Sequence, residues 1–453
     1  MAQNRTLVRR PGVRDVTEAV RDRRPVYAVL TAAGVSQVGN AMTIVAGPWF
    51  VLQTTGSAAQ TGLVGAAFAL GLLMPILGGP LIDRLGYRRG SVLSDLVSGA
   101  TVATIPALHL AGLLQYWEIV VLVFILTSVN SQGDTARLAL VPALGRLAHM
   151  PNERVNSLDR AIIRSGSVLG PFLAGALIAW IGAVNVLFVD AATFSISALL
   201  VAFGVPRSVD AREQQLEVGG RRRYFAELAD GLRFIRSKTF LLSMIMVATV
   251  GNFFDQPLLM VVAPVYAKEI YGSPASFGAL VGSFGAGAVA GSLLFGSVGR
   301  RWPRRRTFLT SYVVGAVLIY GTLALSPPLG VAIVAAFAAG AAFGPVNPIF
   351  ATVTQENTPP HLLGRVFGAL TAIAQSAIPV GALLAGVAVE GAGLIPTIVG
   401  MGAVYLLVML GMFFNPRLRG MDIRHEPVSG PIDVRAAVQD GETMLASRRT
   451  DIR

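Results

Sequence analysis

The chain lacks the residues that most enzymes and metal sites depend on. It contains no cysteine, which excludes disulfide bonds and thiolate metal sites. Its four histidines are scattered without the spacing of metal ligands, and no glycine is followed by lysine, as a phosphate-binding ATPase loop requires. Charged residues make up only 14% of the 453 residues. A soluble protein of this length needs a more charged surface.

The chain is instead rich in apolar residues. Hydrophobic residues make up 53% of the chain, and the mean hydropathy is +0.62. Repeated apolar runs of about 20 residues predict membrane-spanning helices. The net charge of +12 lies on side chains between these runs, where arginine orients helices and meets anionic lipid headgroups. We therefore expect a membrane lipid partner and no nucleic-acid partner.

The runs predict an all-α membrane protein with twelve transmembrane helices in two six-helix repeats. Every Lys and Arg except Lys268 then falls on one side, which must be the cytoplasm and holds both termini. The fourth span is expected at about 118–138, followed by a basic cytoplasmic loop to about residue 155. The expected parts are a cytoplasmic tail (1–25), a first half (26–204), a central cytoplasmic loop (205–239), a second half (240–414) and a cytoplasmic tail (415–453).

The two halves share short sequences in the same order. Val38-Gly39-Asn40 recurs as Val250-Gly251-Asn252, and Gly56-Ser57 recurs as Gly272-Ser273. Three such echoes, counting a glycine before an Arg-rich loop in each half, indicate an internal duplication. Two repeats with a substrate site between them at mid-membrane are the plan of an alternating-access transporter.

Residues 79–89, between the second and third spans, read Gly-Pro-Leu-Ile-Asp-Arg-Leu-Gly-Tyr-Arg-Arg. This segment resembles the signature loop of the major facilitator superfamily, G-x-x-x-D-R-x-G-x-R-R, at every specified position. A loop that only fixes topology would explain the arginines but not the Asp and Gly spacing. The matching positions are Gly79, Asp83, Arg84, Gly86, Arg88 and Arg89.

The resemblance implies a conformational switch. Glycine allows close helix approach and a tight turn, and a carboxylate can accept hydrogen bonds from a helix N-terminus. In the superfamily this Asp locks the halves in the outward-facing state against the start of span eleven. Asp83 would then lie near residues 364–366, and the arginines of the loop would anchor it at the cytoplasmic side.

A second motif lies in the fifth span. Residues 166–175 resemble the superfamily's antiporter motif, G-x-x-x-G-P-x-x-G-G, with Ala174 in place of one glycine. The motif is associated with export rather than uptake. Glycine and proline also permit close packing and a kink, so plain helix packing is the alternative interpretation. The motif positions are Gly166, Gly170, Pro171 and Gly175.

The fourth span departs from the pattern of drug:proton antiporters, R-x-x-Q-G. Residues 129–133 keep the Gln-Gly pair but lack the Arg. Arg164 in span five is the candidate to replace it, paired with Asp134. Residues 38–49 and 188–194 resemble the branch of macrolide-efflux, multidrug and enterobactin exporters.

Ionisable groups at membrane depth are costly, so each is a functional candidate. Asp255, near the middle of span seven and three residues after Asn252, is the strongest. An apolar surrounding disfavours the charged form of a carboxyl group, which suits a proton carrier, although a structural pairing is the alternative. Asp190 is expected to have a structural role. Candidate residues of the substrate cavity are Asn40, Trp49, Asn130, Asn252, Phe253, Asn347 and Gln375.

These observations predict a secondary active exporter, not an enzyme and without a cofactor or metal. It would exchange protons for drug-like or amphipathic small molecules by alternating access in the bacterial plasma membrane, as a multi-pass monomer. The alternative is dedicated export of one endogenous metabolite, such as a siderophore or a self-made antibiotic. The sequence does not distinguish broad export from export of a single metabolite.

Overall fold

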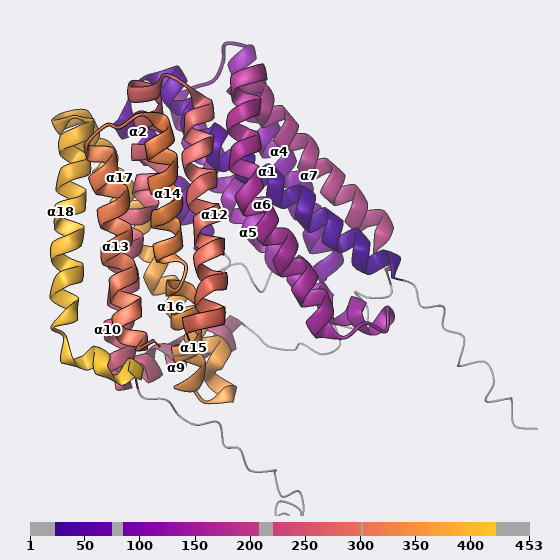
Figure 1. Cartoon of the computed structure of the whole chain (residues 1–453). Helices are drawn as coiled ribbons and strands as arrows, with labels where there is room; N and C mark the ends of the chain where they lie inside the picture. Colours follow the sequence, from indigo (N-terminus) through magenta and orange to yellow (C-terminus); the bar gives the residue numbers. More distant parts are fainter. Residues whose placement is uncertain (1–22, 75–84, 208–220, 300–301, 423–453) are drawn as a thin grey trace, which may run out of the picture.

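The computed structural model describes residues 23–74, 85–207, 221–299 and 302–422. Every element in these ranges is helical (Figure 1). Eleven of the described helices are long and apolar enough to cross a membrane. A further apolar helix, α2, is shorter and ends just before residues 75–84, which lie outside the described ranges. The protein is therefore an all-helical, multi-pass membrane protein, and the twelfth span stays a prediction.

The helices fall into two groups along the chain. The first half consists of α1 (Arg24–Thr55), α2 (Ala58–Leu72), α4 (Tyr87–Leu110), α5 (Tyr116–Leu147), α6 (Asn152–Ile181) and α7 (Ala183–Gly204). The helix α9 (Arg221–Ser237) follows. The second half begins with one span made of α10 (Thr239–Pro257), η2 (Leu258–Val262), α11 (Ala263–Tyr266) and η3 (Ala267–Tyr271).

The second half continues with α12 (Pro274–Val298) and α13 (Arg304–Ala324). Two further spans are interrupted near their middles. They are α14 (Leu329–Phe343) with α15 (Val346–Glu356), and η5 (Pro360–Leu362) with α16 (Leu363–Ser376) and α17 (Ile378–Ala392). The chain then forms α18 (Leu394–Phe413) and η6 (Pro416–Asp422).

Two expected loops are helical. The helix α5 runs through Pro142 to Leu147, so the expected cytoplasmic loop after residue 138 is mostly helix. The expected central loop at 205–239 contains α9, which packs against α16 through Gly231 at the Arg365 backbone and buries Ile235. The helix α9 has charged and apolar faces, a pattern too polar to predict as a span and too periodic for a loop.

The ends of the bundle differ. The described chain begins at α1 and ends at η6 on one end, which also bears α9 and is called the terminal face here (Figure 1). The opposite end, the distal face, carries the six tight turns between consecutive spans. Five of these turns contain a glycine with positive φ, a conformation that costs little without a Cβ: Gly56, Gly112, Gly182, Gly272 and Gly393.

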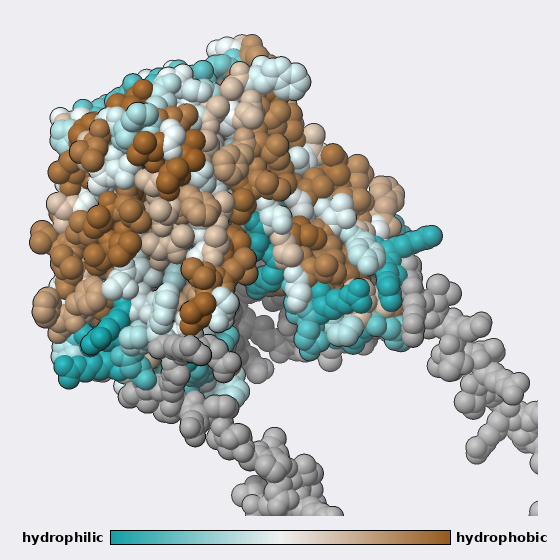
Figure 2. All heavy atoms as spheres, in the orientation of Figure 1, coloured by the Kyte–Doolittle hydropathy of each residue, from teal (hydrophilic) through white to brown (hydrophobic). Residues whose placement is uncertain are grey.

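The halves meet mainly through two helix pairs, α2 with α17 and α6 with α12, and α1 and α2 also contact the span that contains η2 and α11. Glycines allow the close approach in both helix pairs. A Cβ on Gly62 would lie 2.5 Å from the Ala382 carbonyl oxygen, and one on Gly175 would lie 2.9 Å from Gly278 Cα. These contacts lie towards the distal face. Figure 2 shows the surface hollowed between the halves at the terminal face.

Candidate functional site

Asp255 lies in the last turn of α10 and is half-buried. The Tyr405 hydroxyl of α18 donates a hydrogen bond to Asp255 Oδ2 at 2.9 Å. Tyr405 is itself buried, stacks on Phe254 and meets Tyr320 edge-on. The carboxyl group is thus oriented by a phenol that is fixed by its own packing.

Asp255 also lines a cavity of about 100 Å³. All the lining residues of this cavity belong to the second half. Besides Asp255 and Gln256, the lining is apolar: Leu258, Leu259, Ala263, Leu280, Val281, Phe284, Ile319, Leu323, Ala336 and Phe343. A protonated carboxyl group is therefore much easier to accommodate here than a carboxylate.

The backbone is irregular beside Asp255. Pro257 removes an amide donor from the span, and the chain widens into the π-helical segment η2 directly afterwards. A second π-helical segment, η3, closes the same span. Single π-helical turns inside α-helices are frequent at functional sites. Pro257 also packs near Gly381, so this irregular stretch lies against α17.

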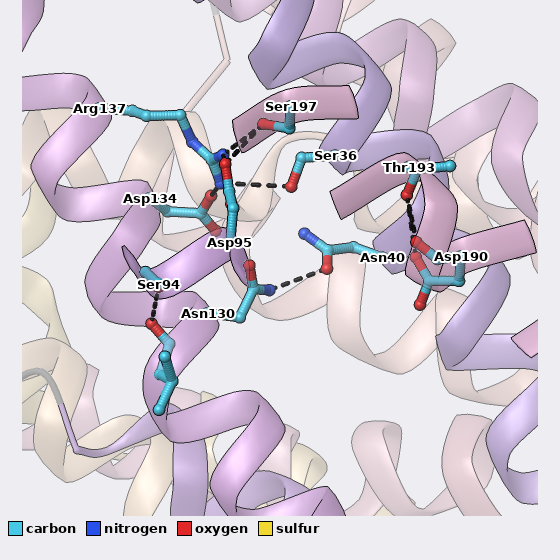
Figure 3. Close-up of polar contacts among 11 residues, drawn as sticks. Ser36, Asn40, Ser94, Asp95, Asn130, Asp134, Arg137, Asp190, Thr193 and Ser197 are labelled. Carbon is cyan, nitrogen blue, oxygen red and sulfur yellow. Dashed lines mark hydrogen bonds and ion pairs between the residues drawn. The ribbon is translucent and has the colours of Figure 1, made fainter. Parts of the chain in front are cut away.

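The first half holds a buried ionic network that the sequence analysis did not identify (Figure 3). Its centre is Arg137 of α5, which is 4% exposed. The Nη1 group of Arg137 donates to both carboxylate oxygens of Asp95 at 2.8 and 2.9 Å and to Ser197 Oγ at 2.9 Å. Its Nη2 group donates to Asp134 Oδ1 at 2.6 Å and to Ser36 Oγ at 3.2 Å.

This network joins four helices of the first half, α1, α4, α5 and α7. Ser197 also donates to Asp95 Oδ2 at 2.7 Å, so both oxygens of the buried carboxylate accept hydrogen bonds. Asp134 differs, because its side chain is 52% exposed. One arginine thus bridges a buried carboxylate and an accessible one.

The partner of Asp134 is Arg137 rather than the expected Arg164. The two share one face of α5 at a spacing of three residues. Arg164 lies exposed on α6. The sequence signal for the observed pair was Asp-x-x-Arg inside an apolar run. The pattern alone does not predict the pair, because Arg137 lies beside the expected end of the span at residue 138.

Asp190 of α7 is buried, as its expected structural role requires. It accepts hydrogen bonds from Thr43 of α1 and from Thr193 Oγ1, the latter at 3.1 Å. Gly39 makes room for it, because a Cβ there would collide with Asp190 and Thr193. The repeated Gly of the Val-Gly-Asn echo therefore has a packing role in the first half.

The expected cavity residues lie in different surroundings. Asn130 Nδ2 donates to Asn40 Oδ1 at 2.8 Å, which ties α5 to α1 (Figure 3). Asn252 Nδ2 donates to the Ala374 carbonyl at 2.9 Å and ties α10 to α16. The other candidates range from a buried residue to an exposed one: Trp49 is buried, Phe253 and Gln375 are half-buried, and Asn347 is exposed.

The antiporter motif of α6 packs against both halves. Gly166 lies against Gln37 and Gly170 against Ala41, both on α1. On the other side, Gly175 and the Pro171 carbonyl lie against Gly278 of α12. The motif is therefore a contact strip between the first helix and the opposite half.

Comparison with known proteins agrees with this architecture. A family profile described as "Transmembrane secretion effector" matches residues 22–440. The chain belongs to this family of major facilitator superfamily transporters. It is thus a multi-pass bacterial membrane transporter and not an enzyme.

Two curated relatives of this transporter are called multidrug efflux pump Tap. The protein from Mycolicibacterium fortuitum is 31% identical over 89% of this chain and 99% of its own length. The protein from Mycobacterium tuberculosis H37Rv is 30% identical over 89% of this chain and 96% of its own length.

Solved structures share the fold at low identity. The nucleoside transporter NupG has a TM-score of 0.70 at 13% identity and covers 86% of this chain and 99% of its own. An inward-facing, unoccupied bacterial homologue of Spinster has a TM-score of 0.65 at 14% identity and covers 90% and 99%. These structures show the fold alone.

Half of the signature loop of this transporter can be placed. Gly79, Asp83 and Arg84 lie outside the described residues. Gly86 adopts a positive φ just before α4. Arg88 donates through Nε to the Val205 carbonyl at 2.8 Å and through Nη2 to the Ala202 carbonyl, at the end of α7. Cations are favourable at a helix C-terminus. Arg89 is exposed.

Proposed function

We propose that this transporter exports drug-like or amphipathic small molecules from the cytoplasm in exchange for protons, by alternating access between its two halves. The relatives called Tap support efflux, since each matches nearly the whole chain. The antiporter motif on α6 supports the direction of transport.

The orientation follows from charge. Lys and Arg stay on the cytoplasmic side of a bilayer. Among the described residues, the Lys and Arg side chains near helix ends lie towards the terminal face, with the exception of Lys268. The terminal face is therefore assigned to the cytoplasm and the distal face to the outside.

The observation that carries alternating access is that the described residues of the two halves meet closely towards the distal face. Contacts of α6 with α12 run from Gly175 and Gly278 at the distal end to Ser167 and Gly285 near the middle of both helices. At the terminal face the surface is hollowed between the halves (Figure 2). This arrangement corresponds to a form open to the cytoplasm, from which rocking of one half would expose the site outside.

Two carboxyl groups are suited to proton coupling. Asp255 borders an apolar cavity that favours its neutral form. Asp134 is accessible and shares Arg137 with Asp95, so its protonation would leave the arginine to the buried partner alone. We assign the proton to Asp255, because its surroundings offer no cation to stabilise a charge among the lining residues.

The test is efflux of a panel of unrelated cationic and neutral dyes from cells that express the protein. We expect faster efflux of several dyes than in cells with an empty vector, and loss of that difference with a protonophore. Efflux that persists after the proton gradient collapses would contradict proton coupling. Failure to export any dye, with the protein present in the membrane, would contradict broad export and favour a single metabolite.

A further inference from the structure

Two charged side chains on the distal face reach from the second half to the first. Lys268 lies in η3 and Glu390 in the last turn of α17. Lys268 Nζ donates a hydrogen bond to the Leu52 carbonyl at 2.8 Å. Glu390 Oε2 accepts from Ser57 Oγ at 2.5 Å and from the Ala59 amide at 2.8 Å. Both side chains therefore bind the chain around the turn between α1 and α2.

The signs of the two charges match the helix ends that they touch. Helix α1 ends at Thr55, so the Leu52 carbonyl belongs to its last turn, where the helix dipole is negative. Helix α2 starts after its N-cap Ser57, and the Ala59 amide is one of its first-turn donors without a helical partner. A cation thus lies at a helix C-terminus and an anion at a helix N-terminus. Both placements are electrostatically favourable.

The corresponding contact on the other side of the molecule has no such charges. The duplication places Ser273 as the N-cap of α12, which packs against the distal end of α6. That end of α6, residues 176–181, reads Ala-Leu-Ile-Ala-Trp-Ile and contains no acid. Gly175 and Gly278 make the contact there, as Gly62 and Gly386 do between α2 and α17. Close packing alone therefore suffices to join a helix pair, and the charges at α2 serve another purpose.

We propose that Lys268 and Glu390 form a clasp that holds the distal face closed and must release before the transporter opens on that side. The inference rests on the proposed alternating-access function. In the closed form both charges bond to the opposite half, and separation of the halves exchanges these bonds for water. The clasp also explains why Lys268 lies at the distal face, which the other Lys and Arg residues of the described chain avoid.

The test measures the distal opening directly. The chain has no cysteine, so a pair of introduced cysteines can be spin-labelled without background. Leu113→Cys and Leu325→Cys suit the purpose, because the two residues follow α4 and α13 at the distal face and are 66% and 82% exposed. Distances are recorded by pulsed electron paramagnetic resonance in lipid nanodiscs.

The clasp variants are Glu390→Gln and Lys268→Met. Each should raise the ratio of the population with the long label distance to the population with the short one by about two- to fivefold, as expected when an exposed charged side chain loses its partner. Lys268→Arg keeps a cationic donor and should restore the wild-type ratio. Glu269→Gln is the matched control for Glu390→Gln. Glu269 is exposed beside Lys268, and its substitution also removes one negative charge from the distal face.

The outcomes separate the clasp from the function on which it rests. The clasp alone would be overturned if the wild-type protein showed two label distances and neither clasp variant changed the ratio of their populations. An equal change in Glu269→Gln would reduce the effect to surface charge and also overturn it. A wild-type protein with one distance under all conditions of pH and added dye would overturn alternating access and the clasp together.

Discussion

Arg137 is the residue that most constrains the first half. It is buried and holds a buried carboxylate, two serines and an accessible carboxylate at once. Breaking such a pair leaves a charge without compensation in a medium of low dielectric constant. The network must therefore be treated as one unit rather than as separate bonds.

Removal of two members together should cost less than the sum of their separate removals. We expect Arg137→Gln to lower the free energy of unfolding by about 3–5 kcal/mol, because Asp95 is left buried and charged. Asp95→Asn combined with Arg137→Gln should cost less than the sum of the single changes. Thermal melting of the purified protein in detergent checks both statements. Arg164→Gln, an exposed arginine on α6, is the control, and strict additivity would contradict the network.

Gly39 offers a second test at the scale of one residue. Gly39→Ala should destabilise the protein by about 1–3 kcal/mol, because the added methyl group meets Asp190 and Thr193. Gly400→Ala on α18 is the control, since nothing lies within 4 Å of a Cβ there. The melting temperatures of the two variants should separate. Equal melting temperatures would contradict this prediction and would mean that α1 and α7 can move apart at little cost to stability.

Asp255 carries the proposed coupling. Asp255→Asn keeps the shape of the side chain and abolishes proton exchange, so we expect dye efflux that no longer responds to the proton gradient. Tyr405→Phe removes only the donor at 2.9 Å and should weaken coupling without abolishing it. Dye uptake into everted vesicles, which corresponds to export from the cell, checks both variants at several imposed pH gradients. Full proton-driven efflux in Asp255→Asn would falsify the assignment.

Single residues could be predicted unevenly from sequence. Asp255 stood out because a carboxyl group within an apolar run is costly. Arg137 did not stand out, because the span was expected to end beside it. It lies well within the helix only because α5 continues through Pro142 to Leu147. Lys268 was visible only as an exception to the charge bias, and its partner, the Leu52 carbonyl, is a backbone group that no side-chain pattern reveals.

At the scale of elements, apolar length predicted the spans well and their ends poorly. Helix α5 extends about two turns beyond its expected end, and α9 replaces part of an expected loop. Hydropathy detects what lies in the bilayer core, whereas helices continue into the interface as long as their backbone bonds are satisfied. The π-helical segments beside Asp255 were also invisible, because they depend on how α10 packs.

The contact of α6 with α12 gives a prediction for an element. Gly278→Ala adds a methyl group that meets the Pro171 carbonyl and Gly175 Cα, at a cost of about 1–3 kcal/mol to the closed distal face. We expect slower dye efflux and a longer distance between the distal labels. Gly296→Ala on the same helix has open space and should behave as wild type. Normal efflux in Gly278→Ala would show that this contact is not tight in the membrane.

At the scale of the whole molecule, the duplication predicted more than any motif. It implied two halves of equal build, and the structure repeats the Gly-Ser turn as an N-cap in both. It did not predict where the halves differ. The buried ionic network belongs to the first half, and the cavity at Asp255 to the second. Such differences reside in side chains that a repeat pattern does not compare.

The most direct test of proton-coupled export uses everted membrane vesicles, in which the vesicle interior corresponds to the outside of the cell. An acidic interior is imposed, and accumulation of the exported dyes is followed by fluorescence. We predict uptake that grows with the pH difference and collapses on addition of a protonophore, and uptake that does not respond to the pH difference in vesicles with Asp255→Asn. Uptake by wild-type vesicles that is the same with and without the pH difference would contradict the account.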